Sequence, residues 1–573
     1  MINSRIEQIF NQIADLMEIL GQDSFVVNHY RKTARTIHRI DADIEQLAMF
    51  GQLKDLNGLG KASIEKIFEF IDTGKIQKHQ DLIAEIPFGI LDLLKVRGLG
   101  PKSIKLIYEK LNVYNLMGLK NAIADGTLMR LPGFGKTKAQ NLAKGIKFIV
   151  ATQGQLVISK AIEMSNYIAD HLESQTTIEK IIPAGQIRQG CDSIDTVSIV
   201  TLANQQDFPK IIQAFITCPG TREIISQSPA DVEITFANEN ISSKIIKAQL
   251  HLATADNLAN IELINSSTPE HINQLRQLAK QNNIDLDQNA QTQQQIYQRL
   301  NLPYIEPSLR QGGNEIELAQ KGKLPKVVQL ADIKGDLHIH SPASDGRTPI
   351  EQLVETAIER NYQYIAITDH SHSSTIANGL SAERLLGNIE IVRKLNQKYP
   401  EIAILAGTEV DIHIDGRLDY PDEILAQLDF VVASVHMTLD CKPSQANKHL
   451  LKAMENPYVN CIGHPTTRII HARPPLPLDI DRIIKQAAET GTALEINSNP
   501  FRLDLKASHG RLAVEAGAML AINTDAHSKA NLHLMKFGIL TAQRAHATSA
   551  NIINCQPLET LKKFVQAKRD RMI

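Results

Sequence analysis

At residues 335–346 the chain reads Gly335-Asp336-Leu337-His338-Ile339-His340-Ser341-Pro342-Ala343-Ser344-Asp345-Gly346, and this stretch decides the fold of the C-terminal part. A mostly apolar segment, residues 327–333, leads into it. Side chains two apart on a strand lie on the same face, so His338 and His340 can reach one point in space. Asp345 follows on a Ser-Asp-Gly turn that can fold its carboxylate back over them. The stretch therefore predicts one corner of a functional site.

Six further apolar segments end in the same way, in His, Asp, Glu or Asn. They are residues 364–370, 403–409, 430–436, 460–464, 493–497 and 519–527. Helical stretches separate these segments, and that alternation is typical of a parallel α/β barrel. In such barrels the residues at the carboxyl ends of the strands converge on one mouth.

Nine of these polar side chains form the predicted metal-ligand set. They are His338, His340, Asp345, His370, Glu409, His436, His464, Asp525 and His527. A lone histidine is more often structural than a ligand, but nine residues at corresponding positions reverse that judgement. Nitrogen and oxygen ligands without cysteine suit two or three divalent ions, with Mn²⁺ favoured and Zn²⁺ or Fe²⁺ as alternatives.

Length and composition describe an ordinary multidomain protein. The chain has 573 residues, 43% of them hydrophobic, which suggests three or four domains. No apolar run approaches the roughly 18 residues of a membrane span, and the first residues lack the apolar centre of a signal peptide. The five cysteines are scattered and odd in number (Cys191, Cys218, Cys441, Cys461 and Cys555). We therefore expect a cytoplasmic protein without membrane contact.

The near-neutral net charge of -2 conceals an asymmetry. Residues 1–150 hold 21 Lys and Arg against 16 Asp and Glu, whereas the remainder is acidic. Thirteen of the 19 histidines lie in residues 331–573. This distribution indicates anion binding at the N-terminal end and metal chemistry at the C-terminal end.

One short unit occurs three times in residues 1–150, each time before a helical stretch. The copies are Leu56-Asn57-Gly58-Leu59-Gly60-Lys61, Val96-Arg97-Gly98-Leu99-Gly100-Pro101-Lys102 and Leu131-Pro132-Gly133-Phe134-Gly135-Lys136. Glycines permit a tight turn and close approach of the backbone, so N–H groups at a helix start can hold a phosphate. One copy alone would indicate an ordinary helix–helix turn. Three copies, each followed by a lysine, predict contacts with a nucleic-acid backbone.

These units resemble the helix-hairpin-helix elements of family X DNA polymerases. The sequence around them, including residues 29–37, is similar to the N-terminal 8-kDa-like and fingers domain of that family. Lys66 falls where some relatives carry a Schiff-base lysine for deoxyribose-phosphate removal. The competing interpretation is a solvated lysine on a helix face, because nothing nearby indicates the desolvation that would lower its pKa.

Residues 184–199 resemble the family X palm motif, in which a strand carries Asp-x-Asp. Residues two apart on a strand share a face, so two such aspartates can bridge two Mg²⁺ ions. Aligned through Ala184-Gly185, Arg188 and Gly190, the aspartates are replaced by Thr196 and Ser198. The third carboxylate position corresponds to Glu233. The resemblance implies a nucleotidyltransferase-like palm with little or no polymerase activity.

Residues 333–573 resemble the PHP (polymerase and histidinol phosphatase) domain, and the whole chain is similar to bacterial family X polymerases that carry it. The resemblance implies a fold class with an all-α helix-hairpin-helix domain (residues 1–150), a small α/β palm (151–267), a linker (268–332) and a distorted (β/α)7 barrel (333–573). By this resemblance, residues of this chain fill all nine ligand positions of the family. Glu495 and Asn497 are expected behind the ligands or in barrel packing, and Asp369 to orient a ligand or cap a turn.

Clustered cations lower the pKa of water and neutralise phosphate oxygens, so the barrel is expected to hydrolyse phosphoesters. We expect His338, His340, Asp525 and His527 to be catalytic. Arg468 and Arg502 follow strand ends and are candidates to hold substrate phosphate, with surface ion pairing as the alternative.

The leading prediction is a metal-dependent 3′→5′ exonuclease or phosphodiesterase for DNA repair, monomeric, acting on gapped or 3′-ended DNA, with its polymerase activity lost. A gap-filling polymerase with proofreading is a second possibility, against which the missing Asp-x-Asp argues. A DNA-binding scaffold with an inert barrel is a third, and a complete ligand set argues against it. A small-molecule phosphatase is the fourth possibility, and the predicted DNA-binding region of residues 1–150 argues against it.

Overall fold

The computed structural model describes residues 2–40, 42–436 and 443–572. The chain divides into two compact units, one of residues 1–153 and 471–473 and the other of residues 154–470 and 474–573. Of the predicted features, only Cys441 and the first methionine lie outside the described residues. Within these residues, no helix combines the length and the apolar character needed to cross a lipid bilayer.

The first unit is helical, as its 3.6-residue apolar spacing predicts. Its α-helices are α1 (Ile2–Ile19), α2 (Ser24–His38), α3 (Ile44–Met49), α4 (Lys61–Thr73), α5 (Gln77–Glu85), α6 (Ile90–Leu94), α7 (Pro101–Leu111), α8 (Leu116–Ala124) and α9 (Lys136–Ala151). In α1, Ile6, Phe10, Ile13 and Met17 fall on one face and are buried. Two hydrophobic clusters result, one around α1, α2 and α4 and one around α6, α7, α8 and α9.

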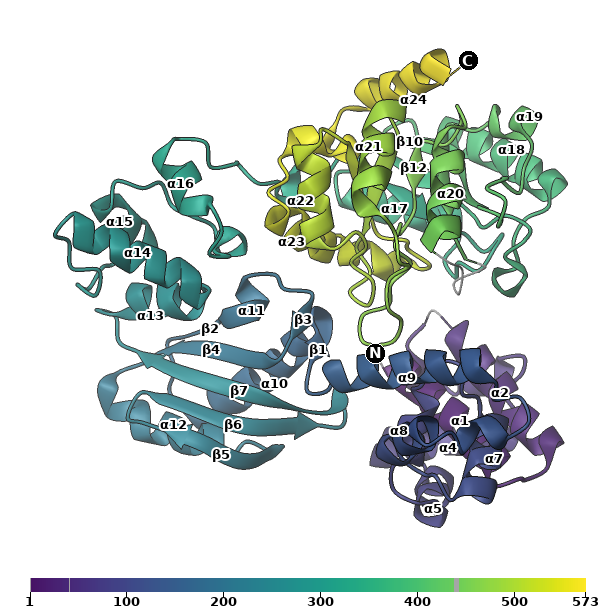
Figure 1. The fold of residues 1–573 in the computed structure, drawn as a ribbon, viewed down its shortest axis with the longest axis horizontal. Coiled ribbons are helices and arrows are strands. Elements are labelled where there is room, and N and C mark those ends of the chain that lie inside the picture. Colours follow the sequence, from purple (N-terminus) through teal and green to yellow (C-terminus); the bar gives the residue numbers. More distant parts are fainter. Residues whose placement is uncertain (1, 41, 437–442, 573) are drawn as a thin grey trace. The chain divides into compact units, whose positions relative to one another are not determined.

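The second unit begins with a mixed five-stranded sheet. Its strands are β2 (Lys180–Pro183), β4 (Thr196–Leu202), β5 (Thr221–Gln227), β6 (Asp231–Asn238) and β7 (Ser242–Ala253), in the spatial order β2-β4-β7-β6-β5 (Figure 1). Strands β4 and β7 are parallel and the other pairs are antiparallel. Helices α10 (Ile158–Gln175) and α12 (Phe208–Ile216) share the hydrophobic cluster of this sheet, which makes it the small α/β domain that the sequence predicts.

The stretch predicted as a linker has a core of its own. Helices α14 (Pro269–Gln281), α15 (Gln293–Arg299) and α16 (Glu315–Gln320) enclose a separate hydrophobic cluster, to which α13 (Leu258–Asn265), from the end of the predicted palm, also contributes. Fully buried Arg310 lies between the rings of Tyr297 and Tyr304, with its guanidinium carbon 5.5 and 5.3 Å from their centroids. The Gln-rich composition pointed to a connector, but the apolar residues between the glutamines are sufficient to form a small helical domain.

The barrel strands are β8 (Gly335–Ile339), β9 (Tyr364–Ile367), β10 (Ala403–Asp411), β11 (Phe430–Ser434), β12 (Cys461–Ile462), β13 (Ala493–Asn497) and β14 (Leu520–Asn523). Within the described residues they form one parallel seven-stranded sheet in sequence order. The amide of His340 donates to the carbonyl of Ala526 at 2.8 Å, so the first and last strands meet and nearly close the barrel. The (β/α)7 prediction is confirmed.

Helices cover this sheet, as the green and yellow ribbons of Figure 1 show. They are α17 (Ile350–Glu359), α18 (Ala382–Lys398), α19 (Asp422–Leu425), α20 (Pro443–Met454), α21 (Ile480–Thr490), α22 (Ala507–Glu515), α23 (Met535–Arg544) and α24 (Leu558–Met572). The inner faces of the strands form one cluster with Leu561 and Val565 of α24. Leu405 and Ala493 belong to it, and alternation along a strand places Glu409 and Glu495 on the same inner face at the mouth.

Candidate metal centre

The nine side chains predicted as ligands lie in one cluster at the mouth of the barrel. Glu409 is central: its carboxylate oxygens lie 2.8 Å from His370 Nδ1, 3.0 Å from His464 Nε2 and 3.3 Å from His436 Nε2. Asp525 and Asp345 flank it. Asp525 Oδ1 is 3.0 Å from His340 Nε2, and Asp345 Oδ1 is 3.4 Å from His527 Nε2.

Three groups within this cluster offer ligand atoms within 4.8 Å of one another. They are His340, Asp345, His370 and His527; His338, His340 and Asp525; and His370, Glu409 and His436. His340 and His370 are shared between groups, so the groups are contiguous. This arrangement can accept more than one ion, in agreement with the predicted number. That the nine residues bind metal stays a prediction.

Several histidine rings of the cluster lie in contact. The His340 ring stacks against those of His370 and His527, each 4.3 Å away between centroids. Nε2 of His338, Nδ1 of His340 and Oε1 of Glu409 are buried and find no hydrogen-bond partner among the described residues. Buried polar atoms without partners are rare in folded proteins, and a bound cation would satisfy them. The donor set and its spacing therefore fit divalent ions.

The charges of the cluster favour cations. Burial, followed by the neighbouring His527 and His370, lowers the pKa of His340 to about 3, so this imidazole stays neutral and keeps a lone pair. Burial opposes ionisation of Glu409, but the charges of His436, His338 and His370 hold its pKa well below its ordinary value. Burial likewise disfavours protonated His527, yet the hydrogen bond to Asp345 and the charge of Asp525 raise its pKa to about 9. The ionised carboxylates thus stabilise positive charge on the groups around them, which favours cation binding at this site.

Buried carboxylate and amide side chains orient the ligands from behind. Glu495 Oε1 lies 2.7 Å from His338 Nδ1, and its other oxygen accepts the backbone N–H of His464 at 2.6 Å. Asn523 also donates to Glu495, at 3.0 Å. Asn497 donates to Asp525 at 3.1 Å. Such partners fix the tautomer and direction of a metal-binding histidine, and they place Glu495 and Asn497 in the supporting positions that the sequence suggested.

Asp369 holds the turn that carries Asp345. Its carboxylate accepts hydrogen bonds from the amide of Ser341 at 2.8 Å, from the Ser341 hydroxyl at 2.7 Å and from the Ser344 hydroxyl at 2.6 Å. Asn388 supplies a fourth hydrogen bond, at 2.9 Å. The Ser-Pro-Ala-Ser-Asp turn is therefore tied to the adjacent strand end, which fixes where Asp345 projects.

Two of the predicted ligands have unusual backbone angles. His464 has φ 25° and Asp525 has φ 53°, in the left-handed region that residues with a Cβ rarely adopt. Backbone strain of this kind persists where the surroundings over-determine it, and it clusters at functional sites. Both residues follow the end of their strand, where the chain turns sharply so that the side chain faces the mouth.

The two arginines proposed to hold phosphate differ in their surroundings. Arg502 Nε lies 4.0 Å from Asp525 Oδ2, and its buried Nη1 finds no hydrogen-bond partner among the described residues. Arg468 Nη2 is committed elsewhere, 2.8 Å from Asp192 Oδ2 and 2.5 Å from the carbonyl oxygen of Leu503. Arg502 is thus free to meet an anion beside the cluster, whereas Arg468 serves the ion-pair alternative in this structure.

Sequence reasoning missed one buried carboxylate that contacts a predicted ligand. Asp411 Oδ1 lies 2.8 Å from His436 Nδ1, and its other oxygen accepts from the Ser374 hydroxyl at 2.6 Å. Asp411 stands two residues after Glu409 on β10. The same two-residue spacing that indicated His338 and His340 could have found it.

The three glycine units of the N-terminal unit have the same local geometry. The first glycine of each has positive φ: 98° at Gly58, 87° at Gly98 and 81° at Gly133. The second glycine is the N-cap of the following helix and provides no side-chain cap (Gly60 for α4, Gly100 for α7 and Gly135 for α9). N–H groups in the first turn of these helices, except at Pro101 of α7, which has none, therefore remain available for an anion, with an exposed lysine beside each turn.

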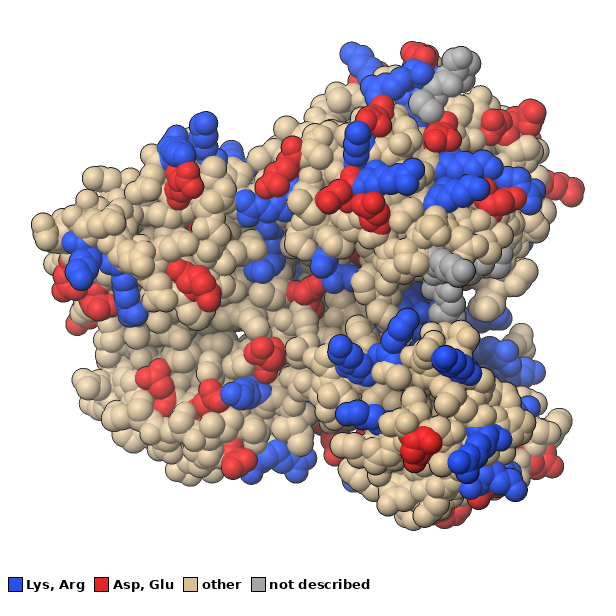
Figure 2. Space-filling model, in the orientation of Figure 1, with Lys and Arg blue, Asp and Glu red and all other residues tan. Residues whose placement is uncertain are grey.

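Lys and Arg side chains are scattered over the face of the N-terminal unit shown in Figure 2, in agreement with the excess of basic residues in residues 1–150. Lys66 is half-buried on α4, and its ammonium nitrogen lies 3.4 Å from the carbonyl oxygen of Ala62. DNA contact by the hairpins and a Schiff-base role for Lys66 both stay predictions.

The palm positions share one face of the five-stranded sheet. Ser198 is in register with Gln249 and Gln249 with Glu233, while Thr196 is in register with Lys247. Glu233 accepts a hydrogen bond from Gln249 at 2.5 Å and pairs with the Lys247 ammonium at 3.1 Å. Glu233 is therefore already paired with a cation from the chain itself, and Asp231, two residues before it on the same face, lies 2.8 Å from His251 Nδ1.

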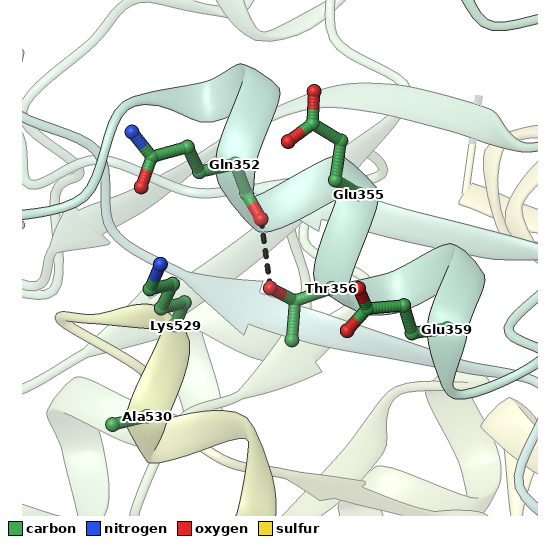
Figure 3. A pocket seen from close by; sticks show the side chains of 6 residues that line it. All are labelled: Gln352, Glu355, Thr356, Glu359, Lys529 and Ala530. Carbon is green, nitrogen blue, oxygen red and sulfur yellow. Dashed lines mark hydrogen bonds between the residues drawn. The ribbon is translucent and has the colours of Figure 1, made fainter.

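A shallow pocket of about 620 Å³ lies on the outer wall of the barrel, between α17 and the 3₁₀ turn Lys529–Leu534 (Figure 3). Gln352, Glu355, Thr356 and Glu359 come from the helix, with the Thr356 hydroxyl donating to the carbonyl of Gln352 at 2.8 Å. None of its lining residues belongs to the histidine cluster, so this pocket is separate from the candidate centre.

Comparison with known proteins gives three domain matches. A profile described as "PHP domain" matches residues 336–499, one described as "Helix-hairpin-helix domain" matches residues 1–76, and one described as "SAM-like Helix-hairpin-helix tandem" matches residues 90–147. The two helical matches together span the three glycine units, and the PHP match spans seven of the nine predicted ligands.

Curated relatives extend these matches. The "DNA polymerase/3'-5' exonuclease PolX" of Bacillus subtilis strain 168 is 32% identical over 98% of this chain and 99% of its own length. A probable phosphatase of Caldanaerobacter subterraneus subsp. tengcongensis is 31% identical over 41% of this chain and 92% of its own. A probable phosphatase of Caldicellulosiruptor bescii is 31% identical over 34% of this chain and 81% of its own.

Proposed function

Because the chain belongs to the PolX family of DNA polymerase/3'-5' exonucleases, we propose that its barrel is a divalent-metal-dependent 3′→5′ exonuclease. The observation that carries the proposal is the gathering of nine nitrogen and oxygen ligands around Glu409 at the barrel mouth. Bound cations there would neutralise phosphate oxygens and lower the pKa of the attacking water. We propose Mn²⁺ as the ion, with Zn²⁺ or Fe²⁺ as alternatives that the same carboxylate and imidazole ligands would accept.

Residues around that centre have different proposed roles: some orient the ligands and one contacts the substrate phosphate. Glu495 orients His338, and Asp369 holds the turn of Asp345, so the ligand atoms are fixed before substrate arrives. Arg502 supplies a guanidinium beside Asp525 that can donate to a phosphate oxygen. His338, His340, Asp525 and His527 remain the proposed catalytic set.

DNA would be held by the N-terminal unit. The N–H groups at the starts of α4, α7 and α9, with Lys61, Lys102 and Lys136, would contact phosphates without reading sequence. A gapped or 3′-ended DNA is the substrate that combines such binding with removal of 3′ nucleotides. We also propose a monomer, in the cytoplasm; the described cysteines Cys191, Cys218, Cys461 and Cys555 are all free of disulfides.

We further propose that the palm has lost polymerase activity. A two-metal polymerase site needs carboxylates on one strand face. This face presents Thr196, Ser198, a Glu233 that is paired with Lys247 and an Asp231 that is paired with His251. An ammonium at that point repels Mg²⁺ rather than binding it. The palm would then contribute structure and DNA contact.

The experiment uses a 5′-labelled primer–template, the full chain and Mn²⁺. We expect stepwise shortening of the primer, abolished in His338→Ala/His340→Ala, while that variant binds the same DNA with unchanged affinity. Loss of DNA binding in the variant would instead support a scaffold role for the barrel.

A small-molecule phosphatase is the second candidate, favoured by the relatives named as probable phosphatases that match the barrel. The two functions separate on substrate. Hydrolysis of p-nitrophenyl phosphate with no shortening of DNA would favour the phosphatase, whereas shortening of DNA at an enzyme concentration that leaves the monoester intact would favour the exonuclease.

A further inference from the structure

A second buried carboxylate lies behind the mouth, one step further from the cluster than Asp411. After β10 the chain makes a tight hairpin, with the amide of His413 donating to the carbonyl of Arg417 at 2.8 Å. The returning strand places Asp419 beside Asp411, its amide 3.3 Å from the carbonyl oxygen of Asp411. The Asp419 side chain is 0% exposed.

The carboxylate of Asp419 is the centre of a hydrogen-bonded group. It accepts from the Ser371 hydroxyl at 2.7 Å, from the Ser373 amide at 2.8 Å and from the Ser373 hydroxyl at 2.5 Å. His413 Nε2 lies 2.6 Å from Oδ1, the oxygen that also accepts the Ser373 hydroxyl. Burial opposes ionisation, but these hydrogen bonds lower the pKa of Asp419 below its ordinary value, so it remains a carboxylate.

This group reaches all three members of one candidate ion site, His370, Glu409 and His436. Ser371 directly follows His370, and its amide donates to the carbonyl of Glu409 at 3.0 Å. The Ser371 hydroxyl, which donates to Asp419, also accepts the amide of Asp411 at 2.8 Å. Asp411 in turn lies against His436 Nδ1. Asp419 therefore influences the orientation of the His436 ring through Ser371 and Asp411. It influences the position of His370 through Ser371 alone.

We propose that Asp419 is a positioning residue that fixes the geometry of the His370–Glu409–His436 ion site through Ser371 and Asp411. The inference rests on the proposed metal-dependent function of the barrel. Asparagine at position 419 would keep the side-chain volume of aspartate but replace one acceptor oxygen by an NH₂ donor. That donor would face the hydroxyl or imidazole donors that now bind the carboxylate, so Ser371 and Asp411 would no longer be held in place. Partners of metal ligands that are disrupted in this way typically cost about 10–100-fold in metal affinity or activity.

A matched control exists on the same barrel. Asp429 also accepts three hydrogen bonds, two from Arg393 at 2.5 and 2.9 Å and one from the Ala406 amide at 2.8 Å. It precedes β11, at the end of the sheet opposite the ligands. Asp429→Asn removes comparable hydrogen bonds without touching the mouth, so it separates positioning from general stability.

The test measures Mn²⁺ binding directly, by the electron paramagnetic resonance signal of free Mn²⁺ in a titration of the full chain. We expect Asp419→Asn to weaken one class of sites about 10–100-fold, or to remove it, and Asp429→Asn to bind as the wild type does. In exonuclease assays, Asp419→Asn should need correspondingly more Mn²⁺ for half-maximal rate, regain its kcat at excess Mn²⁺ and keep its KM for DNA.

Wild-type Mn²⁺ binding in Asp419→Asn would overturn the inference, as would an activity loss that is the same at every Mn²⁺ concentration. A wild-type chain that binds no Mn²⁺ would overturn the proposed metal centre itself, a different outcome from an unchanged variant. If Asp419→Asn does not fold, Ser371→Ala decides, because it removes only the bridging hydroxyl: a weakened Mn²⁺ site supports the inference and an unchanged one refutes it.

Discussion

Nδ1 of His338 lies 2.7 Å from Oε1 of Glu495, and both side chains are completely buried. The contact directs Nε2 of His338 towards Glu409 and Asp525, at 3.5 and 3.7 Å. One carboxylate that is not a predicted ligand thus aims the first histidine of the deciding stretch at the centre of the cluster.

The first prediction concerns that contact. Glu495→Gln replaces one of the two carboxylate oxygens that accept from His338, His464 and Asn523 by an NH₂ donor. We therefore expect the Mn²⁺ affinity of the variant to be about 10-fold or more below that of the wild type. The measurement is Mn²⁺ titration of the full chain. Glu315→Gln is the control, because Glu315 makes the same 2.7 Å contact with buried His271 outside the barrel. Equal effects of both substitutions on Mn²⁺ binding would refute the orienting role of Glu495.

Arg502 and Arg468 give the second prediction. Arg502→Ala removes a guanidinium that faces Asp525, so kcat/KM on DNA should fall about 10–100-fold, the usual value of a hydrogen bond to a charged group. Arg468→Ala should lose much less, because its guanidinium is paired with Asp192. Steady-state shortening assays compare them. A larger loss from Arg468→Ala would show that the Asp192 pair opens to receive the substrate phosphate.

The third prediction tests the glycine units by salt dependence. Replacing Lys61, Lys102 and Lys136 by alanine should weaken DNA binding and lower the slope of log K against log salt by about 2.7, at roughly 0.9 per phosphate contact. The matched control replaces Lys75, Lys120 and Lys147, which are also exposed and lie away from the three helix starts. If both triple variants change the slope equally, general charge rather than the hairpins holds the DNA.

A fourth prediction concerns the palm. In the His338→Ala/His340→Ala background, which protects the primer, we expect no extension of a gapped primer–template with dNTPs and either Mg²⁺ or Mn²⁺. The reason is the Lys247 ammonium on Glu233 and the hydroxyls of Thr196 and Ser198 in place of carboxylates. Any dNTP-dependent extension would show that another carboxylate set completes the site.

Buried Lys568 supports a fifth prediction, on stability against pH. Burial lowers the pKa of this amine to about 7, while it donates to the carbonyl of Met454 and to the Thr492 hydroxyl. A folded pKa below the unfolded value of about 10.4 means that protonation favours unfolding. The wild type should therefore gain stability relative to Lys568→Met as pH rises from 7 to 10. Calorimetric midpoints of both proteins at pH 7 and 9.5 test this, and a pH-independent difference would contradict it.

Much of the fold was readable from the sequence because its periodicities are strong. Seven apolar segments, each followed by polar residues, predicted the seven strands. Six observed strands overlap their segments, and the first, β8, begins at Gly335, directly after the apolar residues 327–333. The Gly-x-Gly units predicted three turns before helices, and the second glycine caps a helix in all three. The connector was less readable, because its glutamines hide the apolar spacing that builds its core.

The amino-acid sequence alone determined which side chains stand at the strand ends, since the two-residue period of a strand fixes what shares a face. Only the tertiary structure decided which of them meet. Asp411 and Asp419 are eight residues apart in the chain and become neighbours through a hairpin, Glu495 reaches His338 across 157 positions, and Arg468 turns to Asp192 instead of the mouth. Contacts of this kind depend on barrel closure and loop packing, which bring distant residues within hydrogen-bonding distance and leave no periodic pattern in the chain.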